Sequence, residues 1–137
     1  MQEHLIIDGN NALHAIPQLA RTLAHDRQMA REDLIRLLEP LQTRNQSLLT
    51  VVFDGRGGKT SITKHRTNEY YSIIYSSSFQ GADGVIERML MAAEYPDRIT
   101  VGTNDNLIRN CAYTHGAAGM RIEELVKKLD ASIELKR

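Results

Sequence analysis

Short apolar runs that are followed by an aspartate constrain the fold of this 137-residue chain more than any other feature. Three of them lie in the segments Leu5–Gly9, Leu48–Gly55 and Ile99–Asp105. An apolar run of this length that stops at an acid, a glycine or an asparagine is typical of a buried strand whose end carries a carboxylate to the edge of a sheet. The sequence therefore predicts a sheet with acidic side chains along one edge.

Segments with helical spacing of their apolar residues alternate with these strands. The predicted helices cover residues 13–23, 31–41, 82–94, 106–115 and 122–129. Further strands are expected at 70–75 and 117–120, and residues 132–135 form either a strand or a frayed tail. Strands that alternate with helices predict one α/β domain over residues 1–137, with a mainly parallel sheet of four or five strands and helices on both faces.

Turn and capping residues give the expected limits of these elements. Asn10 or Asn11 suits the N-cap of the first helix, and Pro17 lies close to its start, where proline costs least. Pro40 is expected to kink or end the second helix. The segment Gly55–Arg66 has three glycines and no apolar pattern, so a loop is predicted there.

Composition narrows the class of protein. Apolar residues make up 42% of the chain, and 17 basic residues balance 17 acidic ones, which is typical of a globular domain and offers no overall attraction to nucleic acid or membrane. The absence of a signal-peptide pattern or a spanning apolar run favours a cytoplasmic protein with no membrane partner. Cys111 is the only cysteine, which excludes an internal disulfide, and its helical neighbours indicate a buried structural thiol.

Four aspartates are expected to meet at the carboxyl edge of the sheet, where α/β proteins bind their ligands. Asp8, Asp54 and Asp105 follow strands, whereas Asp83 opens a helix and Glu87 lies one turn further along it. Carboxylates that converge repel one another, so their meeting calls for a hard cation such as Mg²⁺ or Mn²⁺. Such an ion can activate water and stabilise a phosphodiester during cleavage, which is nuclease chemistry.

Each of these acids also has an ordinary structural interpretation. Asp-Gly and Asp-Asn pairs are common turn signals, and any one of the aspartates can cap a helix. The matching positions of all four favour a shared site over four separate caps. Asn11 is either a helix cap or a member of the site, and His14 is interpreted as a packing residue, since no second histidine is spaced to bind a metal with it.

The segment Gly55–Arg66 contains four basic residues and no acid, directly after Asp54. We expect it to hold an RNA backbone beside the acids, and the alternative is a solvated, mobile loop. The four basic residues are Arg56, Lys59, Lys64 and Arg66.

Taken together, these motifs resemble YacP-like NYN-domain proteins, a branch of the PIN-like nucleases. The resemblance is carried by the opening Leu-Ile-Ile-Asp-Gly-Asn-Asn, the Val-Phe-Asp, the Ala-Asp-x-x-Ile-Glu and the Thr-x-Asp, and it spans nearly the whole chain. It implies a PIN-like α/β/α sandwich and a metal-dependent endoribonuclease that acts on single-stranded or ribosome-associated RNA. By position it assigns the metal or the attacking water to Asp8, Asp83 and Asp105, a further site role to Asn11, and supporting acids at Asp54 and Glu87.

Two other functions fit parts of the pattern. A receiver-like phosphorylation domain would use Asp54 as the phosphorylated acid, but it predicts paired acids after the first strand and a lysine at the end of a late strand, and the chain has neither. An RNA-binding module of the same fold with a weak or inactive site has the same sequence signals, and only activity or metal affinity separates it from a nuclease.

Overall fold

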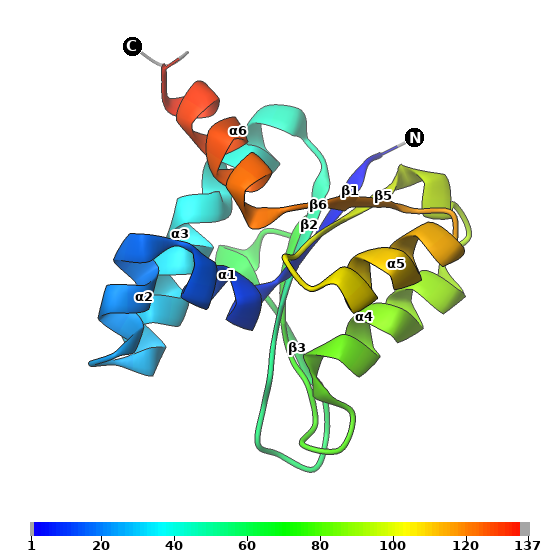
Figure 1. The fold of residues 1–137 in the computed structure, drawn as a ribbon, viewed down its shortest axis with the longest axis horizontal. Coiled ribbons are helices and arrows are strands. Elements are labelled where there is room, and N and C mark those ends of the chain that lie inside the picture. Colours follow the sequence, from blue (N-terminus) through cyan, green and yellow to red (C-terminus); the bar gives the residue numbers. More distant parts are fainter. Residues whose placement is uncertain (1, 135–137) are drawn as a thin grey trace.

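The computed structural model describes residues 2–134, the last four of them by their backbone alone, and its strands form one sheet (Figure 1). The strand order is β3-β4-β2-β1-β5-β6, and every neighbouring pair is parallel except β3 with β4. The strands are β1 (His4–Asp8), β2 (Leu48–Phe53), β3 (Ser61–Lys64), β4 (Tyr71–Tyr75), β5 (Ile99–Gly102) and β6 (Ala118–Met120).

The five parallel strands, numbered along the chain, have the order 3-2-1-4-5. The chain adds β2 and β4 on one side of β1 and then returns to add β5 and β6 on the other side. The carboxyl ends of β1 and β5 therefore flank a topological switch point, where open α/β sheets bind ligands. A receiver-like domain has the order 2-1-3-4-5, so this sheet is not that of a receiver.

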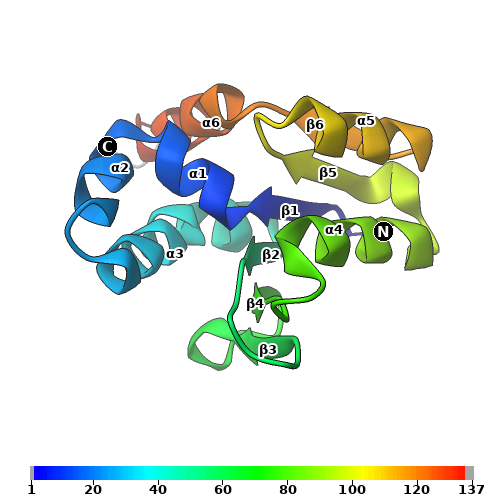
Figure 2. The same cartoon turned by 60° about the horizontal axis from the view of Figure 1, so that its bottom comes forward.

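Helices cover both faces of the sheet, as predicted (Figure 2). One face packs against the first three helices and the last, and the other packs against the remaining two. Neighbouring strand residues point to opposite faces, so Ile7 belongs to the first core and Ile6 to the second. The helices are α1 (Gly9–Ala15), α2 (Pro17–Leu23), α3 (Arg27–Asn45), α4 (Gly81–Ala92), α5 (Asn106–Thr114) and α6 (Ile122–Glu134).

The sheet has six strands within the described residues, rather than four or five, because β3 forms inside the segment predicted as a loop. All four residues of β3 are exposed, and the strand pairs only with β4 at the edge of the sheet. A strand with no buried face leaves no alternation of apolar and polar residues in the sequence, so the pattern could not show it. A short 3₁₀ turn, His65–Thr67, then completes the segment.

The predicted first helix is two helices. Ile16 is extended because the ring of Pro17 disfavours a helical conformation at the preceding residue, so α1 ends at Ala15 and α2 begins at the proline. The N-cap of α1 is Asp8 rather than Asn10 or Asn11.

The second predicted helix is longer at both ends. It starts at Arg27, capped by Asp26, and continues through Pro40 to Asn45, because the buried leucines on both sides of the proline hold it against the sheet. At the end of the chain, α6 continues to Glu134, so residues 132–134 are helical, and Leu135 lies outside the described residues. None of the described helices is long and apolar enough to cross a membrane.

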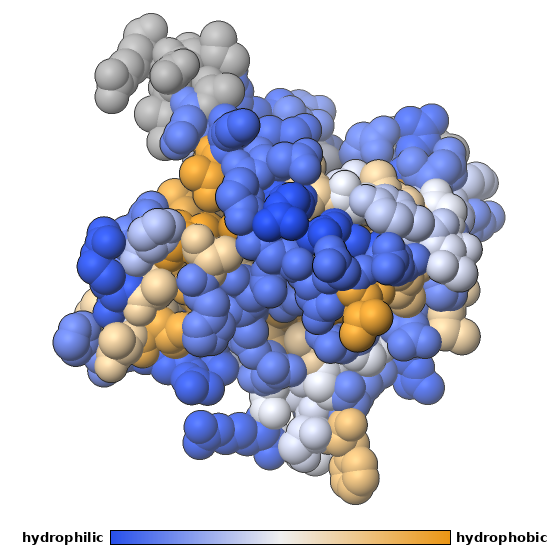
Figure 3. Space-filling model, in the orientation of Figure 1, coloured by the Kyte–Doolittle hydropathy of each residue, from blue (hydrophilic) through white to orange (hydrophobic). Residues whose placement is uncertain are grey.

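Apolar and polar side chains are unevenly distributed over the surface. In the view of Figure 3, apolar side chains gather on the side of α1, α2 and α6, whereas hydrophilic side chains cover most of the surface over α5 and β6.

Candidate active site

Asp8 occupies the last position of β1, and only 5% of its surface is exposed. Its Oδ1 accepts a hydrogen bond from the Asn11 amide at 3.4 Å, and its Oδ2 accepts one from the Thr103 hydroxyl at 3.0 Å. Burial raises the pKa of the Asp8 carboxyl to about 6, against the lowering effect of those hydrogen bonds, and the charges of Asp83 and Asp54 raise it further. The acid is thus held rigidly at the switch point with a carboxylate that is costly to ionise.

Thr103 joins Asp8 to Asp105. Its side chain is fully buried after β5, and its hydroxyl oxygen, which donates to Asp8, also accepts a hydrogen bond from the Asp105 amide at 3.1 Å. The Asp105 carboxylate caps α5 by accepting from the Leu107 amide at 2.9 Å. One Asp105 oxygen is therefore used structurally, as the capping interpretation expected, while the charge of the group still acts on Asp83.

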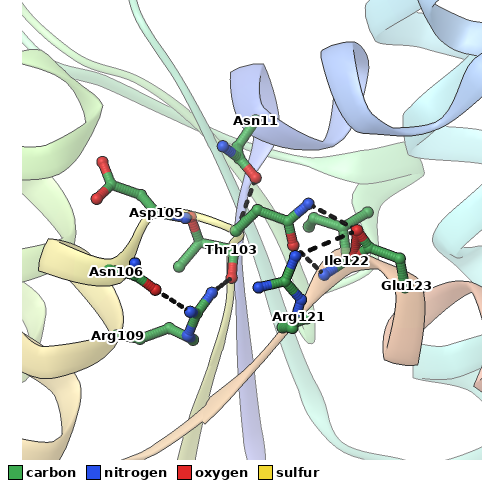
Figure 4. Close-up of polar contacts among 9 residues, drawn as sticks. Asn11, Thr103, Asp105, Asn106, Arg109, Arg121, Ile122 and Glu123 are labelled. Atoms are coloured by element: carbon green, nitrogen blue, oxygen red, sulfur yellow. Dashed lines mark hydrogen bonds and ion pairs between the residues drawn. The ribbon is translucent and has the colours of Figure 1, made fainter.

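Asn11 fixes the loop that carries Asp105, as Figure 4 shows. Its Oδ1 accepts from the Asn104 amide at 2.7 Å, and the Asn104 side chain in turn accepts from the Ile122 amide and donates to Glu123. Arg109 holds the same loop from the other side by donating to the Thr103 carbonyl at 2.9 Å. Asn11 thus acts in this structure as a positioning residue that ties α1, the loop after β5 and α6 together.

Asp54 follows β2 and links three elements. Its Oδ1 accepts from the Ala82 amide at the start of α4 at 2.7 Å, and its Oδ2 accepts from the Asn10 side chain at 2.5 Å. Gly81 suits this turn because it has a positive φ of 70°, which residues with a side chain rarely adopt; a Cβ there would lie at an ordinary contact distance of 3.7 Å from Asp54 Oδ1. Asp54 therefore holds the first turn of α4 beside α1.

Asp83 lies in that first turn of α4, and its carboxylate forms no hydrogen bond within the described residues. Partial burial raises its pKa, and the charges of Asp105 and Asp54 raise it further. Glu87, one turn on, is exposed, and its charge acts on the Cys111 thiol of α5 rather than on the pKa of Asp8 or Asp83. Cys111 is partly buried, and this burial, with the charge of Glu87, raises its thiol pKa.

The donor set offers only oxygen ligands, which suits Mg²⁺ or Mn²⁺, but within residues 2–134 no three acidic, histidine or cysteine side chains are grouped closely enough to hold an ion together. Mg²⁺ usually keeps several waters and binds through one or two carboxylates, so a cluster of three is not required. The charge of Asp83 contributes to the raised pKa of Asp8, as expected of two carboxylates near one another. The chemistry of the site therefore fits a hydrated divalent ion.

The four basic residues of the segment after Asp54 are divided by β3. Arg56 and Lys59 lie at the carboxyl edge, in a cavity that Asp54 also lines. Lys64 pairs in register with Ser72 near the other end of β4, about 10 Å along the strand from Ser61, and donates a hydrogen bond to the Ser72 hydroxyl. Arg66 follows in the 3₁₀ turn, so only two of the four lie beside the acids.

The match to known proteins extends over the same residues. A model of the YacP-like NYN domain matches residues 5–137. The chain belongs to the YacP-like NYN-domain family. It is 28% identical over 127 residues to the protein YacP of Bacillus subtilis (strain 168), an alignment that covers 92% of this chain and 74% of that protein. The family assignment made from the motifs is confirmed.

Solved structures show the same fold. Two crystal structures of Rae1 (YacP) from Bacillus subtilis, one of them a tryptophan-to-leucine mutant, match with TM-scores of 0.79 and 0.80 and identities of 26% and 25%. Each match covers 97% of this chain and 76% or 78% of the Rae1 chain. Membership of the family indicates a nuclease-like function connected with RNA.

Three polar residues of the site were not identified from the sequence. Thr103 and Asn104 precede Asp105 in the Thr-x-Asp motif, but neither was assigned a role of its own from the sequence. Arg31 of α3 donates to the Asp54 carbonyl at 3.3 Å, but as a basic residue on an amphipathic helix it looked like any exposed cation.

Proposed function

We propose that this protein is a divalent-metal-dependent endoribonuclease that cleaves single-stranded or ribosome-associated RNA, for instance mRNA, in the cytoplasm. One observation carries the proposal: four aspartates from separate elements are electrostatically coupled at the switch point of the sheet. Asp8, Asp54 and Asp105 each accept structural hydrogen bonds, but the Asp83 carboxylate accepts none within the described residues, and repulsion among the four acids costs stability. A cationic cofactor that binds a phosphodiester is the simplest reason for the arrangement.

In this proposal Asp8, Asp83 and Asp105 hold a hydrated Mg²⁺ or Mn²⁺, at least one of them through a bound water, while Asp54 adds negative charge beside it. The ion would supply an activated water and offset the charge that develops on the cleaved phosphate. Asp83 contributes the carboxylate that has no hydrogen-bond partner within the described residues, whereas Asp8 is oriented by Thr103 and the Asn11 amide. Asn11 keeps the Asp105 loop in place through Asn104.

The RNA backbone is proposed to lie along the basic residues that follow β2. Arg56 and Lys59 are beside Asp54 and would contact phosphates next to the cleaved one. Lys64 and Arg66 would contact the chain further along the edge strand. Phosphate contacts of this kind are not specific for sequence, so they would position many RNAs alike.

Asp83→Asn tests the proposal. The change is isosteric and breaks no hydrogen bond within the described residues, so the fold should be kept, whereas Mg²⁺- or Mn²⁺-dependent cleavage of a labelled single-stranded RNA should be lost. Asp97→Asn, an exposed aspartate of the 3₁₀ turn Pro96–Arg98, is the matched control and should cleave like the parent. Cleavage by the Asp83 variant at the parent rate would refute the assignment.

An RNA-binding module without activity is the second candidate, because Asp8, Asp54 and Asp105 all have structural hydrogen bonds that would keep them in place without catalysis. It predicts that the parent protein binds RNA but leaves it intact with every divalent metal tested. The same cleavage assay therefore separates the two candidates.

A further inference from the structure

A cavity of about 590 Å³ lies between the first turns of α3, the segment after β2 and the end of β4. Four cationic side chains line it, and Asp54 is the one acid among them. The chain as a whole has no net charge, so this is a local concentration of positive charge. The cations are Arg27, Arg31, Arg56 and Lys59.

Arg31 is held in the cavity wall by contacts that leave most of its donors unused. Its guanidinium lies over the rings of Phe53 and Tyr75, at 5.5 and 5.3 Å from their centres, and one Nη donates to the Asp54 carbonyl. Its Nε is buried without a hydrogen-bond partner. A buried donor that lacks a partner costs stability, so the side chain is held here by its ring contacts and the Asp54 carbonyl rather than by a full set of hydrogen bonds.

The other three cations are also available. Within the described residues, the side chains of Arg27, Arg56 and Lys59 form no hydrogen bond or ion pair. Arg27 is the first residue of α3, where the helix dipole adds partial positive charge. All four cations can therefore be directed at an anion.

The cavity wall is preformed. Gly55 packs so closely on the Ser76 carbonyl that a Cβ would lie 2.2 Å from its oxygen, which keeps the segment after β2 against the end of β4. The Ser78 amide donates to the Gly57 carbonyl at 2.9 Å, and the Ser77 amide donates to the Thr60 hydroxyl at 3.1 Å. An anion would therefore enter a site whose backbone is already in place.

We infer that this cavity binds a phosphate group of the RNA, adjacent to the phosphate that is cleaved. The inference rests on the proposed function and adds a subsite to it. Asp54 contributes both to the cavity and to the electrostatics of Asp8 and Asp83, so one RNA chain can reach both places. Arginine suits the role because its planar fork donates two parallel hydrogen bonds to phosphate oxygens. The phosphate is either an internal one or the terminal phosphate of a processed RNA.

Arg27→Glu is the decisive variant. Within the described residues the side chain has no hydrogen bond or ion pair to lose, and an acid in the first turn of a helix favours folding, so a binding defect would not come from unfolding. Affinity for a labelled single-stranded RNA, measured in chelator so that no cleavage occurs, should fall about tenfold. The slope of log affinity against log salt should flatten by ~0.7, as expected when one phosphate contact is lost.

Arg36→Glu provides the matched control on the same helix, because it makes the same change in charge outside the cavity and loses only a surface pair with Asp33. It should keep the parent affinity and slope. Arg31→Lys keeps the charge but removes the planar fork, and it should weaken binding as well. If Arg27→Glu and Arg31→Lys both bind RNA as Arg36→Glu does, the cavity is not a phosphate site.

Two further measurements show whether the bound phosphate is terminal or internal, and whether the cavity itself binds phosphate. RNAs with a 5′-phosphate, a 3′-phosphate or neither distinguish a terminal from an internal phosphate, since only a terminal site would discriminate among them. Competition of the labelled RNA with inorganic phosphate should be weaker for Arg27→Glu than for Arg36→Glu. These binding results do not depend on cleavage, so loss of the cavity and loss of the nuclease function, tested by Asp83→Asn, are detected independently.

Discussion

The end of β1 and the start of α4 each place an aspartate at the switch point, but they hold it in different ways. Asp8 is buried and accepts two hydrogen bonds, whereas Asp83 is exposed and accepts none within the described residues. Hydrogen bonds fix the position of the Asp8 carboxyl, but its burial makes the charged form costly. The Asp83 carboxylate is not fixed in this way. The difference shows how one edge of a sheet can combine a rigidly held carboxylate with one that has no hydrogen-bond partner within the described residues.

The largest expected effect of this difference is on how the free energy of unfolding of the metal-free protein depends on pH. The Asp8 pKa of about 6 lies above its value in the unfolded chain, so the folded state holds more protons between pH 4 and 6. Stability should therefore fall as pH rises through this window, by about 3 kcal/mol for a shift of ~2 units.

In Asp8→Asn the stability should not fall as pH rises from 4 to 6, so this variant should be more stable than the parent above pH 6. Asp83→Asn should show a smaller change in the same direction, because Asp83 is exposed and its pKa is raised less by burial. Urea unfolding in chelator from pH 4 to 7.5 measures both. Equal pH profiles for the parent and Asp8→Asn would show that burial does not strain this carboxyl.

Thr103→Val should remove the hydrogen bonds that hold Asp8 and the Asp105 amide in place. The buried hydroxyl serves Asp8 and the Asp105 amide, so its removal leaves two polar groups without a partner and should cost about 2 kcal/mol. Thr22→Val, which removes an exposed hydroxyl that donates to the Gln18 carbonyl, is the control and should change stability by less than about 0.5 kcal/mol. The urea midpoint compares them, and equal midpoints would mean that the hydroxyl contributes little.

Metal binding should depend on Asp83, the aspartate without a hydrogen bond within the described residues. A divalent ion that binds only the folded protein raises stability by about 1.4 kcal/mol at ten times its Kd. Thermal unfolding in millimolar Mn²⁺ should thus occur at higher temperature for the parent and be nearly unchanged for Asp83→Asn. A parent protein that melts at the same temperature with and without Mn²⁺ or Mg²⁺ would argue against a metal site.

The alternation of strands and helices was predictable because the buried strands are rich in apolar, aromatic or β-branched residues and the helices carry apolar stripes. β3 was not predictable, since an exposed edge strand has no such signal. The sequence contains Pro17, but the break between α1 and α2 at Ile16 was not predicted, because a proline is also tolerated in the first turn of one continuous helix. Similarly, Pro40 was expected to kink or end α3, and packing of the leucines around it keeps the helix going to Asn45.

The sequence by itself determined that acids follow β1, β2 and β5, because the position of a residue after a strand is a local property of the chain. Tertiary structure alone decided which of them share a space and which partners they have. It joined Thr103 to Asp8 across 95 residues, moved Lys64 and Arg66 away from the acids along β3, and brought Arg27 and Arg31 to Asp54. The physical reason is that hydrogen bonds and electrostatic coupling depend on distance in space, which strand order sets and spacing along the chain does not show.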